Sequence, residues 1–243
     1  TRKESSAASD LYKRQLLLFS FEKKYFDKEN VSSEFVGHPL LEKKEMGKID
    51  INQIIGKNKA IISIFPGSRL SEITMLLPIL LNFIKLMSVK YNDISYVFHS
   101  TNEHRSLIKS YITKSKLSNC GVISDSAIKE HMLKKSIFAV CKSGTVSLEV
   151  CNAKIPSIIL YKMGLINFLI IKILVKTKYA NIINIAANEE IIPELLQSKC
   201  NANNIYMHIN DFLDNPIKIE NQIAKVDSVL NKFKTKNSSV EMA

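Results

Sequence analysis

Short apolar segments alternate with helical ones through the middle of the chain, and this alternation constrains the fold more than any other feature. Five segments rich in Ile, Val, Phe and Tyr have the length and composition of strands: 60–65, 94–100, 120–124, 137–141 and 157–161. Apolar residues recur at helical spacing between them: 71–91, 103–115, 126–136 and 145–153. The sequence therefore predicts an α/β fold, a Rossmann-like parallel sheet with helices on both faces.

The flanking segments predict further helices and a domain boundary. C-terminal helices are expected at four places: 165–175, 189–198, 203–214 and 218–234. Gly37 and Pro39 flank His38 and predict a hinge, because glycine permits unusual backbone angles and proline fixes φ. We expect a polar lead with the remnant of a preceding domain, one ligand-binding domain, and a C-terminal helix with its tail: 1–35, 36–214 and 215–243.

The charge balance favours anionic ligands. The formal net charge is +11, from 34 Lys and Arg against 23 Asp and Glu, which suits nucleic acid, an acidic membrane surface or phosphorylated small molecules. Only four of these cations are arginines (Arg2, Arg14, Arg69 and Arg105), and no aromatic-interleaved basic tract occurs. We therefore expect no nucleic-acid partner.

Cysteine and histidine spacing gives no metal signal. No C-x-x-C or H-E-x-x-H pattern occurs, so no metal site is predicted. Cys120, Cys141 and Cys151 lie in or beside apolar segments, as reduced core thiols do. Residues 1–15 lack the apolar core of a signal peptide, and a cytoplasmic location is the simpler interpretation.

The loop "PGSR" after the predicted strand 60–65 is the first candidate site, because parallel sheets bind ligands beyond the carboxyl ends of their strands. Gly67 lets a ligand approach the backbone, Ser68 offers a hydroxyl, and Arg69 can bind phosphate bidentately. The N-terminus of the following helix adds free N–H groups. The loop suits a diphosphate; an ordinary corner with a surface arginine is the alternative.

The segment "SGTVSLE" after the predicted strand 137–141 is the second candidate. Ser143, Gly144 and Thr145 form a small polar turn, and Glu149 follows Thr145 by one helical turn. Its carboxylate can accept hydrogen bonds from two ribose hydroxyls. The alternatives are a hydroxyl that only caps the helix and a glutamate on a solvated face.

Three further polar residues are weaker candidates. Tyr161 and Lys162 follow the predicted strand 157–161, where the lysine can neutralise a phosphate or lipid headgroup or simply extend into solvent. Asn184 interrupts an apolar stretch and can reach a base or sugar.

An apolar run "MGLINFLII" (163–171) is too short to span a bilayer. Lysines beside it suit a peripheral contact with membrane lipid: Lys162, Lys172, Lys176 and Lys178. Burial of the run as a helix within the domain is the alternative.

These segments, in this order, resemble the lipid-A-disaccharide synthases, a bacterial glycosyltransferase family with the GT-B fold. The resemblance covers residues 16–214 and rests on these segments: "FEKKYF" (21–26), "FVGHPL" (35–40), "FPGSRLSEI" (65–73), "SGTVSLE" (143–149), "YKM" (161–163), "LVKTKY" (174–179) and "IIPELLQ" (191–197).

The resemblance implies that the chain is the C-terminal, UDP-binding domain of a GT-B fold followed by C-terminal helices. The donor would be UDP-2,3-diacylglucosamine and the acceptor 2,3-diacylglucosamine 1-phosphate. The acceptor's 6-hydroxyl attacks the anomeric carbon with inversion and releases UDP, in the biosynthesis of lipid A. The resemblance implies no metal or other cofactor, and a site of action at the cytoplasmic face of the inner membrane.

Carried over residue by residue, the resemblance assigns roles in one UDP-sugar site. By this resemblance the first loop binds the diphosphate through Gly67, Ser68 and Arg69, and Glu72 of the next helix supports that loop. Ser143, Gly144 and Thr145 face phosphate and sugar. Glu149 binds the ribose, and three residues complete the nucleotide pocket: Tyr161, Lys162 and Asn184. The connection between the two domains of the family lies at Gly37, His38 and Pro39.

The sequence departs from the family pattern in two places. Ile183 and Asn188 stand where the family has a proline and a glycine around Asn184. Residues 16–29 resemble only the last strand and exit helix of the N-terminal domain, and no residue matches the family's general base. We therefore expect no transfer by this chain alone. Three explanations stay open: one product of a split gene, with a separately encoded N-terminal half as partner, a decayed copy, or a fragment. The alternatives are another UDP-sugar GT-B enzyme, such as an epimerase or a peptidoglycan glycosyltransferase, and a non-catalytic basic binding module.

Overall fold

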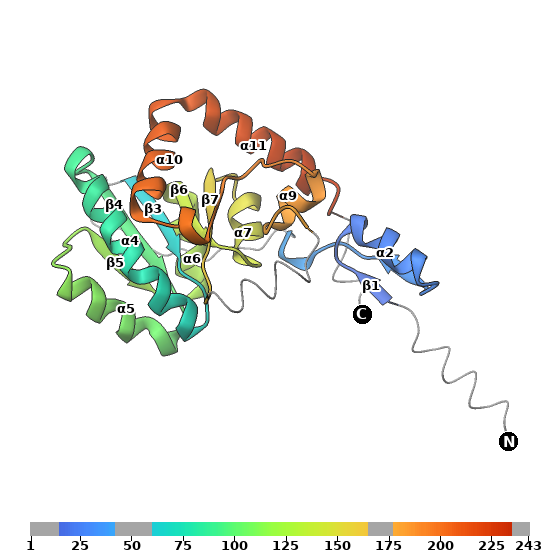
Figure 1. Cartoon of the computed structure of the whole chain (residues 1–243), viewed down its shortest axis with the longest axis horizontal. Helices are drawn as coiled ribbons and strands as arrows, with labels where there is room; N and C mark the ends of the chain where they lie inside the picture. The colour runs from blue at the N-terminus through green and yellow to red at the C-terminus, as the bar shows by residue number, and fades with distance from the viewer. Residues whose placement is uncertain (1–14, 42–59, 165–176, 235–243) are drawn as a thin grey trace, which may run out of the picture. The chain divides into compact units, whose positions relative to one another are not determined.

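The computed structural model describes residues 15–41, 60–164 and 177–234 (Figure 1). The chain divides into two compact units: Thr1–Lys44 with Ser228–Ala243, and Glu45–Asp227. The polar lead up to residue 14, the predicted helix 165–175, Lys172 and Lys176 lie outside the described residues. The predicted domain boundaries stay predictions.

The second unit is built on a six-stranded sheet in which every neighbouring pair is parallel, in the order β5-β4-β3-β6-β7-β8. The strands are β3 (Ala60–Phe65), β4 (Ile94–His99), β5 (Cys120–Ile123), β6 (Ser136–Lys142), β7 (Ser157–Tyr161) and β8 (Glu194–Leu196). The first five match the five predicted strands to within one residue at each end. The predicted parallel α/β sheet is therefore confirmed.

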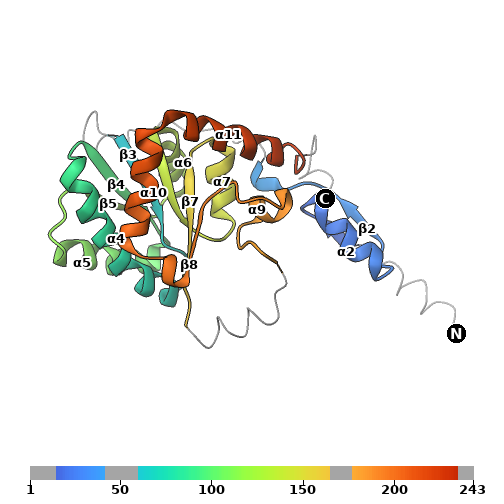
Figure 2. The ribbon, with the colours of Figure 1, turned by 45° about the horizontal axis from the view of Figure 1, so that its top comes forward.

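Helices cover both faces of this sheet (Figures 1 and 2). They are α4 (Leu70–Lys90), α5 (Asn102–Lys114), α6 (Ser126–Lys135), α7 (Val146–Asn152), α9 (Ile182–Ala187), α10 (Ala202–Asp214) and α11 (Pro216–Leu230). Side chains alternate between the two faces of a strand, and those of Ile62 and Ile64 join one core cluster with α4, α5 and α10. The intervening side chains face the opposite side, where α6 packs on β3 and α7 packs on β6.

Helix α4 is the central helix of this core. Eight of its side chains are buried, from Ile73 to Met87, and burying an aliphatic side chain of this size contributes about 1.5–3 kcal/mol. Among the described helices it is also the one long and apolar enough to cross a membrane. Its contacts with α10 and with the sheet cluster are those of a core helix in a folded domain.

The prediction of a helix at 189–198 is wrong. The chain there forms an irregular turn, the short strand β8 and the 3-10 helix η3 (Gln197–Lys199), preceded by the unpredicted helix α9. Pro193 interrupts any helix in this segment, and its carbonyl accepts a hydrogen bond from the Ile159 N–H of β7. Sheet pairing with β7 therefore outweighs the helical spacing of the apolar residues.

The first unit contains β1 (Gln15–Leu17) and β2 (Ser33–Phe35), paired in parallel, with η1 (Ser20–Glu22) and α2 (Lys23–Lys28) between them. The strand and helix predicted within 16–29 are present, whereas β2 was not predicted. Gly37 has a φ of 81°, and His38 is buried with its Nδ1 accepting a hydrogen bond from the Leu40 N–H. Pro39 begins the 3-10 helix η2 (Pro39–Leu41), and the hinge role of these residues stays a prediction.

Candidate functional site

The candidate site lies where the direction of the sheet connections reverses. From β3 the chain proceeds outward to β4 and β5, then returns to β6 on the other side of β3 and continues to β7. Phe65, the last residue of β3, pairs with Cys141 near the end of β6. The loops that leave these two strands therefore begin side by side, and such reversal points are where open α/β sheets bind ligands.

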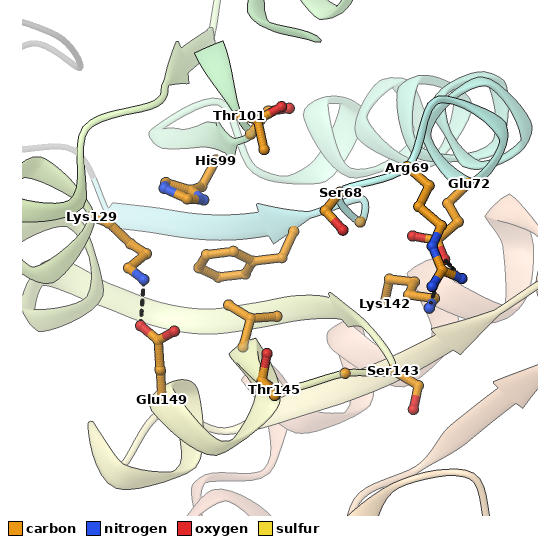
Figure 3. A pocket seen from close by; sticks show the side chains of 15 residues that line it. Ser68, Arg69, Glu72, His99, Thr101, Lys129, Lys142, Ser143, Thr145 and Glu149 are labelled. Atoms are coloured by element: carbon orange, nitrogen blue, oxygen red, sulfur yellow. Dashed lines mark ion pairs between the residues drawn. The ribbon is translucent and has the colours of Figure 1, made fainter. Parts of the chain in front are cut away.

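A cavity of about 300 Å³ opens at this point (Figure 3). The structure brings together at its wall eight residues predicted from the sequence: Gly67, Ser68, Arg69, Glu72, Ser143, Gly144, Thr145 and Glu149. The two predicted loops therefore line one cavity.

One end of the cavity holds two cations around one carboxylate. Lys142 Nζ lies 2.9 Å from Glu72 Oε1, and an Arg69 guanidinium nitrogen lies 3.8 Å from the same oxygen. Burial of Glu72 opposes its ionisation, but the hydrogen bond from Lys142 and the nearby charges keep its pKa below the usual value. The corner thus carries one positive charge in excess, and the Arg69 side chain is 80% exposed and free to meet a ligand.

The two longest helices that begin at the cavity, α4 and α5, lack side-chain caps. Arg69 precedes the 21-residue α4 and Thr101 precedes the 13-residue α5, and neither side chain accepts a hydrogen bond from its helix. Helices α6, α9 and α10 begin differently, with side-chain caps from Asp125, Asn181 and Asn201. The first N–H groups of α4 and α5 therefore remain available to an anion beside Arg69 and Lys142.

Two observations explain the glycine at position 67: its backbone conformation and the close approach of the Glu72 side chain. Its φ is 110°, and a Cβ at this position would lie 2.5 Å from Glu72 Oε2. We expect Gly67→Ala to lower the free energy of unfolding by about 1–3 kcal/mol, because it combines backbone strain with displacement of the carboxylate. Urea denaturation measures this change.

Gly144→Ala is the matched control, because a Cβ there meets no atom within 4 Å. We expect its denaturation midpoint to stay near that of the unchanged chain. Equal midpoints for the two variants would contradict the role given to Gly67.

The other end of the cavity holds Glu149, whose carboxylate forms an ion pair with the Lys129 ammonium from α6 (Figure 3). The side chain of Glu149 is 22% exposed, so it does not lie on an open solvated face. Thr145 occupies the N-cap position of α7 without a side-chain capping bond. Its hydroxyl therefore does not serve as the cap that the sequence also allowed.

The wall between these two ends comes from the carboxyl end of β4. His99 Nε2 and Ser100 Oγ are buried, and neither has a hydrogen-bond partner among the described residues. Burial lowers the pKa of His99 to about 4, with the Lys129 charge acting in the same direction. The imidazole is therefore neutral at neutral pH, and its Nε2 is enclosed by the protein.

Three predicted residues do not line the cavity: Tyr161, Lys162 and Asn184. Tyr161 ends β7, where the Lys142 Nζ lies 5.4 Å from the centre of its ring. Asn184 is fully buried, and its amide donates to the Ile192 carbonyl and Glu194 and accepts from two backbone N–H groups. All the hydrogen-bonding capacity of this amide is used within the chain.

The sequence argument missed five polar cavity residues, His99, Ser100, Thr101, Lys129 and Lys142, and two apolar ones, Phe65 and Val146. The first three follow from the same rule that identified the other loops, since β4 also ends at this edge of the sheet. Lys142 directly precedes the predicted residue Ser143, so its place in the sequence could have identified it as a cavity residue. Lys129 had none, because only the tertiary fold brings α6 to α7.

Nothing in the described ranges gathers three or more His, Cys, Asp or Glu side chains into a potential metal site. Cys120, Cys141, Cys151 and Cys200 are free thiols. Burial raises the pKa of Cys151 to about 12, which makes it an unreactive core group.

Comparison with known proteins identifies the family of the chain. A family model described as "Lipid-A-disaccharide synthetase" matches residues 2–242. The lipid-A-disaccharide synthase of Rickettsia prowazekii (strain Madrid E) is 33% identical over 227 residues, which are 92% of this chain and 59% of that protein. The enzyme of Rickettsia bellii (strain OSU 85-389) is 32% identical over 97% of this chain and 63% of its own length. The chain thus spans about three fifths of these relatives.

Solved structures share the fold at low sequence identity. The Staphylococcus aureus MnaA–UDP structure has a TM-score of 0.67 and 14% identity, covering 95% of this chain and 57% of its own. UDP-GlcNAc 2-epimerase from Neisseria meningitidis, bound to UDP-GlcNAc, has a TM-score of 0.68 and 15% identity over 96% and 61% of the two chains. These similarities establish the GT-B type of α/β fold, and the match to the family model over nearly every residue shows that this chain belongs to the lipid-A-disaccharide synthetase family.

Proposed function

We propose that this chain is the donor-binding part of a lipid-A-disaccharide synthase and holds UDP-2,3-diacylglucosamine by its UDP group. One observation carries the proposal: a single cavity joins the excess cation of the Arg69–Glu72–Lys142 corner to the Glu149 carboxylate. A nucleoside diphosphate needs this combination of a cationic end for phosphates and a carboxylate for ribose hydroxyls. The UDP and UDP-GlcNAc bound to the two structural neighbours support the same ligand class.

The proposed pose assigns the diphosphate, the sugar and the ribose to walls of the cavity. The diphosphate lies at Gly67, Ser68 and Arg69 and the start of α4, with Lys142 as an additional cation. Ser143, Gly144 and Thr145 face phosphate and sugar, and Glu149 holds the ribose. Cationic groups and helix N–H groups at the diphosphate would stabilise the charge that develops on the leaving UDP.

The complete transfer reaction also needs an acceptor and a general base. We propose that the acceptor is 2,3-diacylglucosamine 1-phosphate and that its general base comes from the part of the relatives that this chain does not span. We propose a cytoplasmic location with peripheral membrane contact through the lysines around 163–171, of which Lys172 and Lys176 lie outside the described residues.

Calorimetry with UDP and uridine tests the proposed ligand. We expect UDP to bind with a Kd in the range of about 1 μM to 1 mM and uridine to bind far more weakly, because the cationic corner contacts only the diphosphate. Glu149→Ala should weaken UDP binding about tenfold or more, because it removes the charged acceptor for the ribose.

Glu189→Ala is the matched control, because Glu189 forms its ion pair with Lys225 away from the cavity. We expect it to bind UDP as the unchanged chain does. Absence of UDP binding, together with RNA binding that weakens steeply with salt, would favour the basic binding module instead.

A further inference from the structure

We infer that Lys129 is a positioning residue that holds the Glu149 carboxylate ready for the two ribose hydroxyls of the donor, an inference that rests on the proposed function. Lys129 belongs to α6 and Glu149 to α7, so the ion pair links two separate helices across one end of the cavity (Figure 3). Both residues line the cavity. The pair lies at the end of the cavity away from Arg69, Glu72 and Lys142.

The pair is shielded from solvent. Only 13% of the Lys129 side chain and 22% of the Glu149 side chain are exposed. Shielding strengthens the attraction, and it also makes an unpaired carboxylate costly at this place. Glu149 therefore depends on Lys129 to stay fixed beside a ligand that itself carries negative charge.

The start of α6 fixes the place from which Lys129 acts. The Asp125 carboxylate accepts hydrogen bonds from the Ala127 and Ile128 N–H groups, and the Lys129 N–H donates to the Asp125 carbonyl. Lys129 therefore lies in a capped first turn. A cation in the first turn opposes the helix dipole, so this position does not favour lysine on helical grounds. The ion pair with Glu149 explains a lysine at this position.

The geometry leaves Glu149 able to bind a ligand. Lys129 Nζ contacts Oε2 of the carboxylate. A carboxylate has about four acceptor positions, so Oε1 and the remaining lone pair of Oε2 can accept from neighbouring hydroxyls. A cavity ligand with two adjacent hydroxyls would use them, whereas a ligand without hydroxyls would gain nothing from a fixed Glu149.

This difference separates a positioning role from two simpler roles. If Lys129 only adds positive charge to the cavity, its removal weakens every diphosphate to the same extent. If it only ties α6 to α7, its removal lowers stability and changes no ligand preference. If Lys129 positions Glu149, its removal weakens binding of ligands that carry the ribose hydroxyls more than binding of ligands that lack them.

Calorimetry with UDP and with 2′,3′-dideoxyuridine diphosphate tests the inference on the full chain. We expect Lys129→Met to weaken UDP binding about tenfold and the dideoxy ligand less than about twofold. Lys129→Arg, which keeps the charge and the hydrogen bond, should retain UDP binding within about threefold. Lys154→Met removes a lysine paired with Asp227 outside the cavity and should change neither ligand.

The outcomes separate this inference from the proposed function. If the unchanged chain binds neither ligand, both fail. If it binds UDP but prefers it no more than the dideoxy ligand, UDP binding stands, while the ribose role of Glu149 and the inference on Lys129 both fail. If Lys129→Met weakens both ligands equally, only the inference on Lys129 fails. The preference of the unchanged chain and the Lys129→Arg result decide the question even if Lys129→Met does not fold.

Discussion

Asn184→Ala is expected to lower the free energy of unfolding by about 3 kcal/mol or more, because it leaves several buried polar groups without partners. The Asn184 Oδ1 accepts 2.9 Å hydrogen bonds from the N–H groups of Ile191 and Ile192. Its Nδ2 donates to the Ile192 carbonyl at 2.7 Å and to Glu194 at 2.8 Å. Glu194 in turn accepts from the N–H groups of Ala180 and Asn181.

Urea denaturation measures the change, and Asn203→Ala is the control because Asn203 is exposed on α10. We expect the control to stay within about 0.5 kcal/mol of the unchanged chain. A different result would restore the predicted ligand role of Asn184: unchanged stability in Asn184→Ala together with a loss of UDP binding.

Removing both cations of the diphosphate corner is expected to weaken UDP binding about 100-fold or more. Arg69 and Lys142 share one carboxylate, and each can give a charge-assisted hydrogen bond to phosphate, worth about 1.5–3 kcal/mol. The double variant Arg69→Ala/Lys142→Ala leaves Glu72 unpaired beside the ligand, which adds repulsion. Calorimetry measures the affinity for UDP.

The double variant Arg105→Ala/Lys109→Ala removes the same net charge from exposed positions on α5. It should bind UDP within about threefold of the unchanged chain, because surface charges outside a site are screened by salt. Similar losses in the two double variants would mean that overall charge, and not the corner at Glu72, attracts the nucleotide.

The sequence predicted the parts of the fold that local patterns determine. Segments 60–65 and 157–161 are apolar except for one serine each, and β3 and β7 have these bounds. The strand β8 was missed because it has three residues and exists through pairing with β7. Local periodicity carries no information about such a partner.

The candidate site also has residues that the sequence predicts and residues that only the tertiary fold brings together. Gly67, Arg69 and Thr145 follow predicted strands, and the rule on carboxyl ends of parallel strands places them at one edge. Lys129 is 20 residues from Glu149 in the sequence and meets it only through the packing of two helices. Asn184 was assigned to the nucleotide by resemblance, while its contacts depend on a turn at 191–192 that no local signal predicts.

The pairing of Phe65 with Cys141 has a mechanical consequence. It sets the spacing of the two loops through a strand-to-strand distance of about 4.8 Å, so a bound diphosphate that touches both loops bridges two strands. Pulling β3 from β6 would then require release of the ligand as well. Occupancy by nucleotide sugar would thereby protect the centre of the sheet from unfolding and proteolysis, in proportion to the logarithm of ligand concentration over Kd.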